Sequence, residues 1–256
     1  MTRSRKTQMN QWLEEISQSN ITKLSGASFN NFTYHGEDGI ILYLLSKLGN
    51  VPPVFVDIGS GDCITGNCAN LAVHFGWDGI FIDKNEQQLQ TGKRFYQSFI
   101  SRRQNIRIVN ELVLTENVNR LISQSGISGE IGLLSIDIDG NDYWIWKAID
   151  IIAPRIVVIE AKVEFGKRNV IVPYGGHNHH SIDKIYNGAS VEAYKRLGEK
   201  KGYKLVGANK QGYNLFFVKK GEQLKEETVE EILSDPETIN SFYPDSLFLK
   251  YKFVTE

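Results

Sequence analysis

The stretch that most constrains the fold is Val54–Asp62, an apolar run of strand length that ends in an acid and a Gly-Ser-Gly turn. Its β-branched and aromatic residues suit a strand covered on both faces, as in parallel sheets. Gly59 and Gly61 permit a tight turn and close approach of the backbone to a bound molecule. Burying Asp57 is costly without a partner, and ligands of open α/β sheets bind at the carboxyl ends of strands. The stretch therefore predicts a central strand that opens into a ligand loop.

Length and composition indicate an ordinary globular chain. Its 256 residues can form one α/β domain with additions. Hydrophobic residues make up 41%, charged residues 23%, and a net charge of -1 argues against a nucleic-acid partner. No apolar run reaches the roughly 18 residues of a membrane span, and the polar start is not followed by the apolar core of a secretory signal. We expect a cytoplasmic protein whose oligomeric state the sequence does not indicate.

Strands and helices alternate regularly after the first strand. Strands are predicted at 80–83, 106–110, 131–139 and 155–160, with helices between them. This alternation is typical of a parallel sheet. Two further strands, 203–207 and 215–218, are joined through Gly212 and predict an antiparallel hairpin. We expect an α/β fold with a seven-stranded, mostly parallel sheet, helices on both faces and a carboxyl-terminal antiparallel hairpin.

Acidic residues end four of these predicted strands: Asp57, Asp83, Asp137 with Asp139, and Glu160. Because the carboxyl ends of parallel strands meet at one edge, these side chains should lie close together. Asp83 lies 22 residues beyond Gly61, about where dinucleotide-binding folds place the carboxylate that holds ribose hydroxyls. The third glycine of that fingerprint is replaced by Ile64, which weakens a nicotinamide interpretation.

We expect a single domain with additions at both ends. A helical arm and linker should occupy residues 1–32, the catalytic core 33–220, and a helical, charged extension 221–256. An insertion at 161–187 carries His177, His179 and His180, and connections of this length without structure are uncommon inside compact domains. It is interpreted as a functional loop, whose histidines could act on a substrate, bind a metal or lie on a polar surface.

The ordered motifs resemble class I S-adenosylmethionine-dependent methyltransferases, whose first motif is an apolar strand, an acid and a Gly-x-Gly turn, as in Val56–Gly61. More narrowly, the sequence looks like the FkbM-like methyltransferases. That resemblance covers about residues 33–218 and rests on residues 35–41, 76–80, 134–142, 188–190 and 201–203. The sequence departs from many relatives at Asp62-Cys63, where they have a small residue or another glycine.

The resemblance implies a Rossmann-like fold and S-adenosylmethionine (SAM) as the cofactor. It places Gly59 and Gly61 against the methionine part, Asp83 on the ribose hydroxyls and Glu111 near the adenine, while Asp57 organises the loop and helps with the cationic amine. Glu37, Asn67 and Asp137 are further cofactor-binding candidates at the same edge. The implied reaction is O-methylation of a small polar or carbohydrate-like acceptor, which the sequence does not name.

Methyl transfer requires an acceptor held in line with the methyl group, and a base if the acceptor must lose a proton. The candidate catalytic residues are Asp137, Asp139, Glu160 and His180. Asp137, Asp139 and Asn141 could alternatively hold Mg²⁺, since hard cations take oxygen ligands. Two other functions stay open: a metal-dependent glycosyl or nucleotidyl transferase that uses Asp137-Ile138-Asp139, and a non-catalytic nucleoside-binding module.

Overall fold

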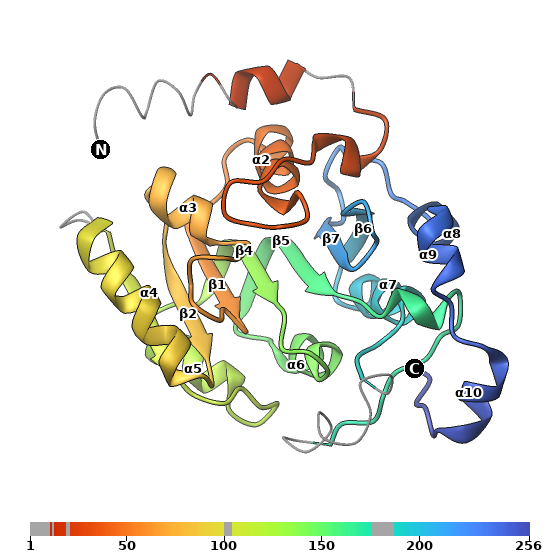
Figure 1. The fold of residues 1–256 in the computed structure, drawn as a ribbon. Coiled ribbons are helices and arrows are strands. Elements are labelled where there is room, and N and C mark those ends of the chain that lie inside the picture. The colour runs from red at the N-terminus through yellow and green to blue at the C-terminus, as the bar shows by residue number, and fades with distance from the viewer. Residues whose placement is uncertain (1–10, 12, 19–20, 100–103, 176–186) are drawn as a thin grey trace.

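The computed structural model describes residues 11, 13–18, 21–99, 104–175 and 187–256. Its centre is a seven-stranded sheet with the order β3-β2-β1-β4-β5-β7-β6 (Figure 1). The strands are β1 (Val54–Ile58), β2 (Asp78–Asp83), β3 (Ile106–Asn110), β4 (Gly129–Ile136), β5 (Ile152–Glu160), β6 (Tyr203–Ala208) and β7 (Asn214–Lys219). The first five run parallel, whereas β7 pairs antiparallel with both β5 and β6. The predicted fold class, including its terminal hairpin, is confirmed.

Helices cover both faces of this sheet (Figure 1). One layer holds α2 (Glu37–Leu48), α3 (Ala69–His74) and α4 (Glu86–Phe99), and the other holds α5 (Val118–Gln124), α6 (Asp142–Ala148) and α7 (Val191–Lys200). Parallel strands need such crossover connections. In β1, Phe55 packs in the first layer and Val56 in the second, because successive side chains of a strand point to opposite faces. This two-sided burial explains why β1 is apolar along most of its length.

Five strands have bounds that differ from the prediction, and the differences in β2 and β4 bear on the site. β2 begins at Asp78, two residues before the predicted start, because Gly79 pairs with Phe55 of β1. A Cβ at Gly79 would lie 2.7 Å from the Phe55 ring, so a glycine is needed for this close approach. β4 ends at Ile136. The prediction that this strand continues to Asp139 is therefore wrong, and Asp137 lies in the loop that follows.

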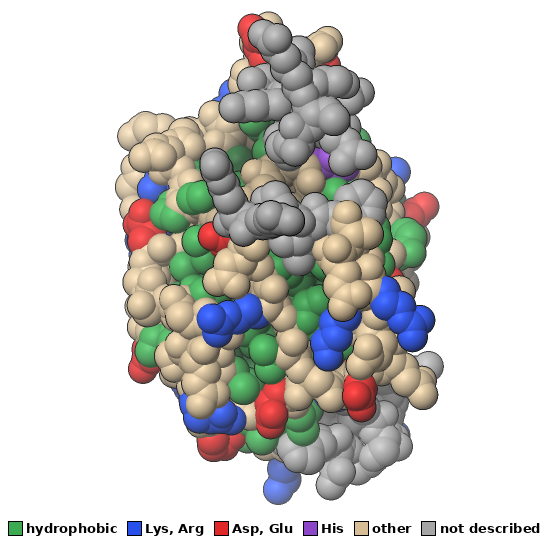
Figure 2. Space-filling view, turned by 90° about the vertical axis from the view of Figure 1, so that its left-hand side faces the viewer, with side chains coloured by type: hydrophobic (Ala, Val, Ile, Leu, Met, Phe, Trp, Pro, Cys, Tyr) green, Lys and Arg blue, Asp and Glu red, His purple; other side chains and the backbone are tan. Residues whose placement is uncertain are grey.

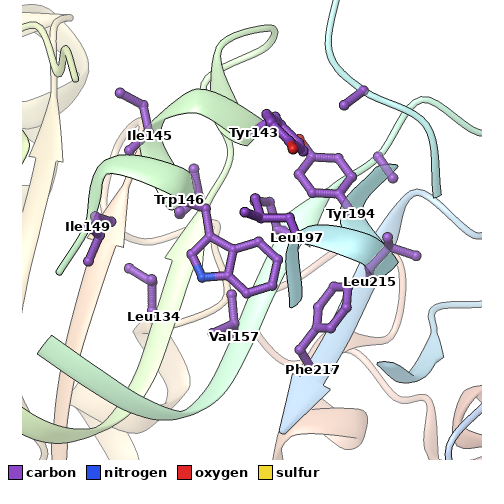
Figure 3. Close-up of a cluster of buried hydrophobic side chains, with 14 of the residues drawn as sticks. Leu134, Tyr143, Ile145, Trp146, Ile149, Val157, Tyr194, Leu197, Leu215 and Phe217 are labelled. Atoms are coloured by element: carbon purple, nitrogen blue, oxygen red, sulfur yellow. The ribbon is translucent and has the colours of Figure 1, made fainter. Parts of the chain in front are cut away.

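The packing of α6 and α7 on the sheet centres on Trp146, which is 1% exposed (Figure 3). Its ring centroid lies 4.9 Å from that of Phe217 in β7. Gly198 of α7 permits this contact, because a Cβ there would lie 2.8 Å from the Phe217 ring and 3.3 Å from Trp146. Since α6 begins directly after the acidic loop 137–141, this core packing also fixes the position of that loop.

The chain outside the sheet packs on the core at both ends. Before α2, the short helix η1 (Leu24–Ala27) buries Leu24 and Ala27. After β7 follow α8 (Val229–Ile232), α9 (Pro236–Asn240) and α10 (Asp245–Lys250). Phe165 of η2 (Val163–Phe165) contacts the rings of Tyr243 and Phe248 in this extension. None of the helices in the described ranges has the length and apolar character of a membrane span.

Figure 2 shows the flank of the molecule on which α4 lies. Charged side chains of both signs are scattered there among hydrophobic and other polar groups. Among the described side chains of this face, neither sign of charge forms a continuous patch, in keeping with the net charge of -1.

Candidate functional site

A cavity of about 370 Å³ lies at the carboxyl ends of β1 to β4. Its size is within the usual range for small-molecule sites. The strand ends and the segments after them supply its lining: Gly59 and Gly61 after β1; Ile82 and Asp83 at the end of β2, with Lys84, Asn85 and Gln88 after it; Glu111, Leu112, Val113 and Leu114 after β3; and Asp137, Ile138, Asp139 and Asn141 after β4. The cavity therefore occupies the edge at which the sequence predicted a ligand.

The two glycines of the first loop have different roles. Gly59 has φ +83°, and a Cβ there would lie 1.7 Å from the carbonyl oxygen of Asp137. Only glycine fits, because the loop passes against the backbone after β4. Gly61 has φ +54°, and the nearest atom to its added Cβ would be Gln88 Oε1 at 3.8 Å. Gly59 thus allows the loop to pack against the backbone of Asp137, whereas Gly61 leaves open space on the side of the cavity.

Asp83 ties the end of β2 to the glycine turn. Its Oδ2 accepts a hydrogen bond from Gly61 N at 2.8 Å, and its Oδ1 accepts one from Asn85 N at 2.7 Å. Glu111 N in turn donates to the carbonyl oxygen of Asp83 at 3.0 Å. A carboxylate has about four lone-pair sites. Asp83 can therefore hold the loop and still accept hydrogen bonds from hydroxyls of a ligand.

Asp57 and Asn67 support the loop and do not line the cavity. Asp57 is 4% exposed, and burial raises its pKa to about 7, although hydrogen bonds from Cys68 and Ser135 oppose this shift. Asn67 Nδ2 donates to the hydroxyl of Ser135 at 3.0 Å. Both of these predicted cofactor-binding residues thus hydrogen-bond to the side chain of Ser135.

Glu37 joins the start of α2 to the β6–β7 hairpin. Its Oε1 accepts hydrogen bonds from the side-chain amides of Asn209 and Asn214, both at 2.8 Å. Its Oε2 accepts one from His35 N at 3.1 Å. Glu37 is 2% exposed and is not part of the cavity lining. It holds the hairpin beside the site.

The loop after β4 and the end of β5 form an acidic cluster. Carboxylate oxygens of Asp137, Asp139 and Glu160 all lie within 4.8 Å of one another. Asp139 has φ +56°, a left-handed conformation that few residues other than glycine adopt and that aspartate tolerates better than most. Asp142 is 1% exposed and accepts hydrogen bonds from Ile138 N and Gly140 N, both at 2.8 Å. These bonds hold the loop that brings the cluster together.

The acids of this cluster repel one another, and burial together with this repulsion raises the pKa values of Asp137 and Glu160. Burial raises the pKa of Asp137, and repulsion from Asp142 and Asp139 raises it further. Asp137 is nevertheless exposed to solvent, and it lines the cavity. Burial also raises the pKa of Glu160, as does repulsion from Asp137, whereas nearby Lys162 lowers it. A cation bound here would relieve this repulsion and favour the charged carboxylates.

Two kinds of cation fit this chemistry. A sulfonium or ammonium group would pair directly with the carboxylates. A divalent cation would take oxygen ligands from Asp137, Asp139 and Glu160, and Asn141 lines the same cavity. The structure thus adds Glu160 to the Mg²⁺ ligands predicted from the sequence.

One predicted site residue lies outside the described residues, and several residues that line the cavity were not predicted. His180, together with His177 and His179, lies outside the described residues. The sequence prediction missed Asn85 and Gln88, which line the cavity. Both residues flank the start of α4, directly after Asp83, and this position in the sequence could have indicated that they lie at the site. The apolar run 112–114 after β3 was also missed, and such a run beside a polar strand end suits a flat, apolar part of a ligand.

Comparison with known proteins identifies the fold. No protein-family model matches the sequence, and no curated protein sequence matches it. A solved structure of PKMT2 from Rickettsia typhi in complex with AdoHcy superposes with a TM-score of 0.50 at 10% identity, over 81% of this chain and 57% of that chain. The O-methyltransferase from Bacillus cereus in complex with SAH gives 0.46 at 12% identity, over 86% and 92%. Magnesium protoporphyrin IX methyltransferase (ChlM) from Synechocystis PCC 6803 with bound SAH gives 0.46 at 11%, over 84% and 95%. This chain has the Rossmann-like fold of class I methyltransferases.

Proposed function

We propose that this protein is a SAM-dependent methyltransferase that O-methylates a small polar or carbohydrate-like acceptor. The observation that carries the proposal is the convergence of a Gly-x-Gly turn, Asp83 and an acidic loop on one cavity. A structure with the same fold, PKMT2, was solved in complex with AdoHcy. The narrower resemblance to FkbM-like enzymes stays a prediction.

The cavity offers a complementary group for each part of the cofactor. The open space at Gly61 suits the methionine part, and Asp83 suits the ribose hydroxyls. Glu111 and the apolar residues 112–114 suit the adenine. Asp137 faces a cavity in which its own charge is repelled by neighbouring acids, so a cationic ligand is favoured beside it.

When bound, SAM supplies a methyl group on a sulfonium, whose sulfur keeps the bonding electrons as an acceptor oxygen attacks the methyl carbon. The task of the chain is to hold that oxygen in line and to remove its proton. Glu160 and Asp139 lie beside Asp137 and can accept a hydrogen bond from an acceptor hydroxyl. Glu160 has to be ionised to take this proton, and a cation bound beside it would favour its charged form, while the neighbouring acids keep it more basic than an ordinary glutamate. Glu160 is therefore the proposed proton acceptor among the described residues.

Calorimetry tests the cofactor assignment. The full chain would be titrated with S-adenosylhomocysteine (SAH), with a sugar nucleotide in the presence of Mg²⁺, and with NAD. We expect SAH to bind and the other two not to bind. Binding of the sugar nucleotide alone, dependent on Mg²⁺, would instead establish the glycosyl or nucleotidyl transferase alternative.

A transfer assay tests the reaction. SAM labelled in its methyl group would be incubated with the protein and a panel of methyl glycosides, and label in the glycoside would be measured. We expect label to be transferred to a sugar hydroxyl. SAH binding without transfer to any hydroxyl-bearing acceptor would favour a nucleoside-binding module without catalysis.

A further inference from the structure

We infer that Tyr174, in the insertion after β5, is a positioning residue that holds two walls of the cavity together around its ligand. The inference rests on the proposed function for the identity of that ligand, SAM or SAH. Tyr174 lies outside the glycines and acids at the carboxyl ends of the strands, from which the site was predicted.

The two walls come from strands that are not neighbours. Leu112 to Leu114 follow β3 and form one wall, and Ile138 to Asn141 follow β4 and form part of the other. β2 and β1 lie between β3 and β4 in the sheet, so ladder hydrogen bonds do not join these two loops. Their separation is set by contacts outside the ladder: the helices that follow them are joined by a hydrogen bond from Asn119 Nδ2 to Ala148 O at 2.9 Å, and the loops themselves need a further contact.

Tyr174 supplies such contacts to both walls. Its hydroxyl accepts a hydrogen bond from Thr115 N at 3.4 Å and donates one to Glu116 Oε2 at 3.2 Å. These residues come directly after Leu114. Its ring meets that of Trp144 edge to face, with centroids 6.4 Å apart. Trp144 belongs to α6, three residues after Asn141, so Tyr174 bridges the two walls.

The segment that carries Tyr174 is itself anchored to the β4 side. Trp144 Nε1 donates to the carbonyl oxygen of Val172 at 2.9 Å. Val172 N donates to Gly188 O at 3.0 Å, and Gly188 N donates to Gly140 O at 3.2 Å, inside the acidic loop. Residues 172–174 are therefore fixed on the β4 side, and the Tyr174 hydroxyl is the group that reaches the β3 side.

This arrangement gives Tyr174 an effect on ligand retention. A ligand between the walls gains contacts with both only while their separation is correct, and a site held in its bound geometry binds more tightly than one that must be ordered. Without the hydroxyl bonds, the loop after β3 can move away from the ligand. The ligand should then dissociate faster, since changes of affinity within one site act mainly on the dissociation rate.

The variant Tyr174→Phe in the full chain tests this inference, because it keeps the ring contact with Trp144 and removes both hydroxyl bonds. We expect the Kd for SAH, measured by calorimetry, to rise about threefold to tenfold, the equivalent of about one hydrogen bond. Stopped-flow measurements should show that the increase lies in the dissociation rate. The melting temperature of the ligand-free protein should change little, because Tyr174 is only half-buried.

Tyr203→Phe is the matched control. Tyr203 is 5% exposed, and its hydroxyl donates to Pro154 O at 2.9 Å near the start of β5, the end of the sheet opposite the cavity. It should lower the melting temperature and leave the Kd for SAH unchanged.

The possible failures are distinguishable. If the wild-type protein does not bind SAH, the proposed function fails and this inference fails with it. If the wild type binds SAH and Tyr174→Phe has the same Kd and dissociation rate, only the role of Tyr174 is overturned. An equal rise of Kd in both tyrosine variants would also overturn it, since the effect would then be general loss of structure.

Discussion

Replacing Asp57 by asparagine should remove a pH-dependent destabilisation of the fold. Asp57 is 4% exposed in the central strand, and burial raises its pKa from 3.8 to about 7 despite hydrogen bonds from Cys68 and Ser135. Asparagine has nearly the same shape and remains neutral. The comparison therefore isolates the cost of a buried negative charge beneath the cofactor loop.

The sign follows from proton binding. Between about pH 4 and pH 7, folded Asp57 keeps a proton that the unfolded chain has released, so stability falls as pH rises. The stabilisation is complete below about pH 4 and is lost as pH rises through 7. One pKa unit corresponds to about 1.4 kcal/mol, so the shift of Asp57 is worth about 4 kcal/mol in total, of which about 3 kcal/mol is lost between pH 5 and pH 8.

Urea unfolding of the wild type and Asp57→Asn at pH 5 and pH 8 measures this effect. The free energy of unfolding of the variant, minus that of the wild type, should increase by about 3 kcal/mol from pH 5 to pH 8. Taking this difference removes the contributions of other acids that titrate independently of Asp57. Equal m values would show that both proteins expose the same surface on unfolding. A difference that changes by less than about 1 kcal/mol would refute the reasoning, because Asp57 would then titrate alike in both states.

Three further outcomes are expected. Gly59→Ala should destabilise the fold far more than Gly61→Ala in thermal unfolding, because its Cβ would lie 1.7 Å from a backbone oxygen whereas that of Gly61 faces open space; equal melting temperatures would contradict the role given to Gly59. Asp83→Ala should weaken SAH binding in calorimetry by about 1.5 to 3 kcal/mol for each bond lost to the ligand, and unchanged affinity in a folded variant would exclude Asp83 from the site. Methyl transfer should persist in EDTA, because the acids can bond the ligand and acceptor directly; activity lost to EDTA and restored by Mg²⁺ would instead assign a metal to the carboxylates at 137, 139 and 160.

The sequence by itself determined the sheet and the edge at which the site lies. Residues 54–58 are almost entirely apolar, which indicates burial on both faces, and the strand they form is the third from one edge. The acids recur after successive apolar runs, and in a parallel sheet those ends must meet. Gly59, Gly61, Asp83, Glu111 and Asp137 line the cavity for that reason. Periodicity within a strand or helix is local, so it can be read without knowing the fold.

Only the tertiary structure decided what each acid does. Glu37 is bonded to Asn209, 172 residues away, and no local pattern indicates that pairing. Asp139 lies beside Asp137 and Glu160 because the loop takes a left-handed turn held by Asp142. Tyr174 reaches the loop after β3 from an insertion after β5. These contacts join loops, and loops have no periodicity to report their neighbours; their partners are set by where the packed strands and helices place them.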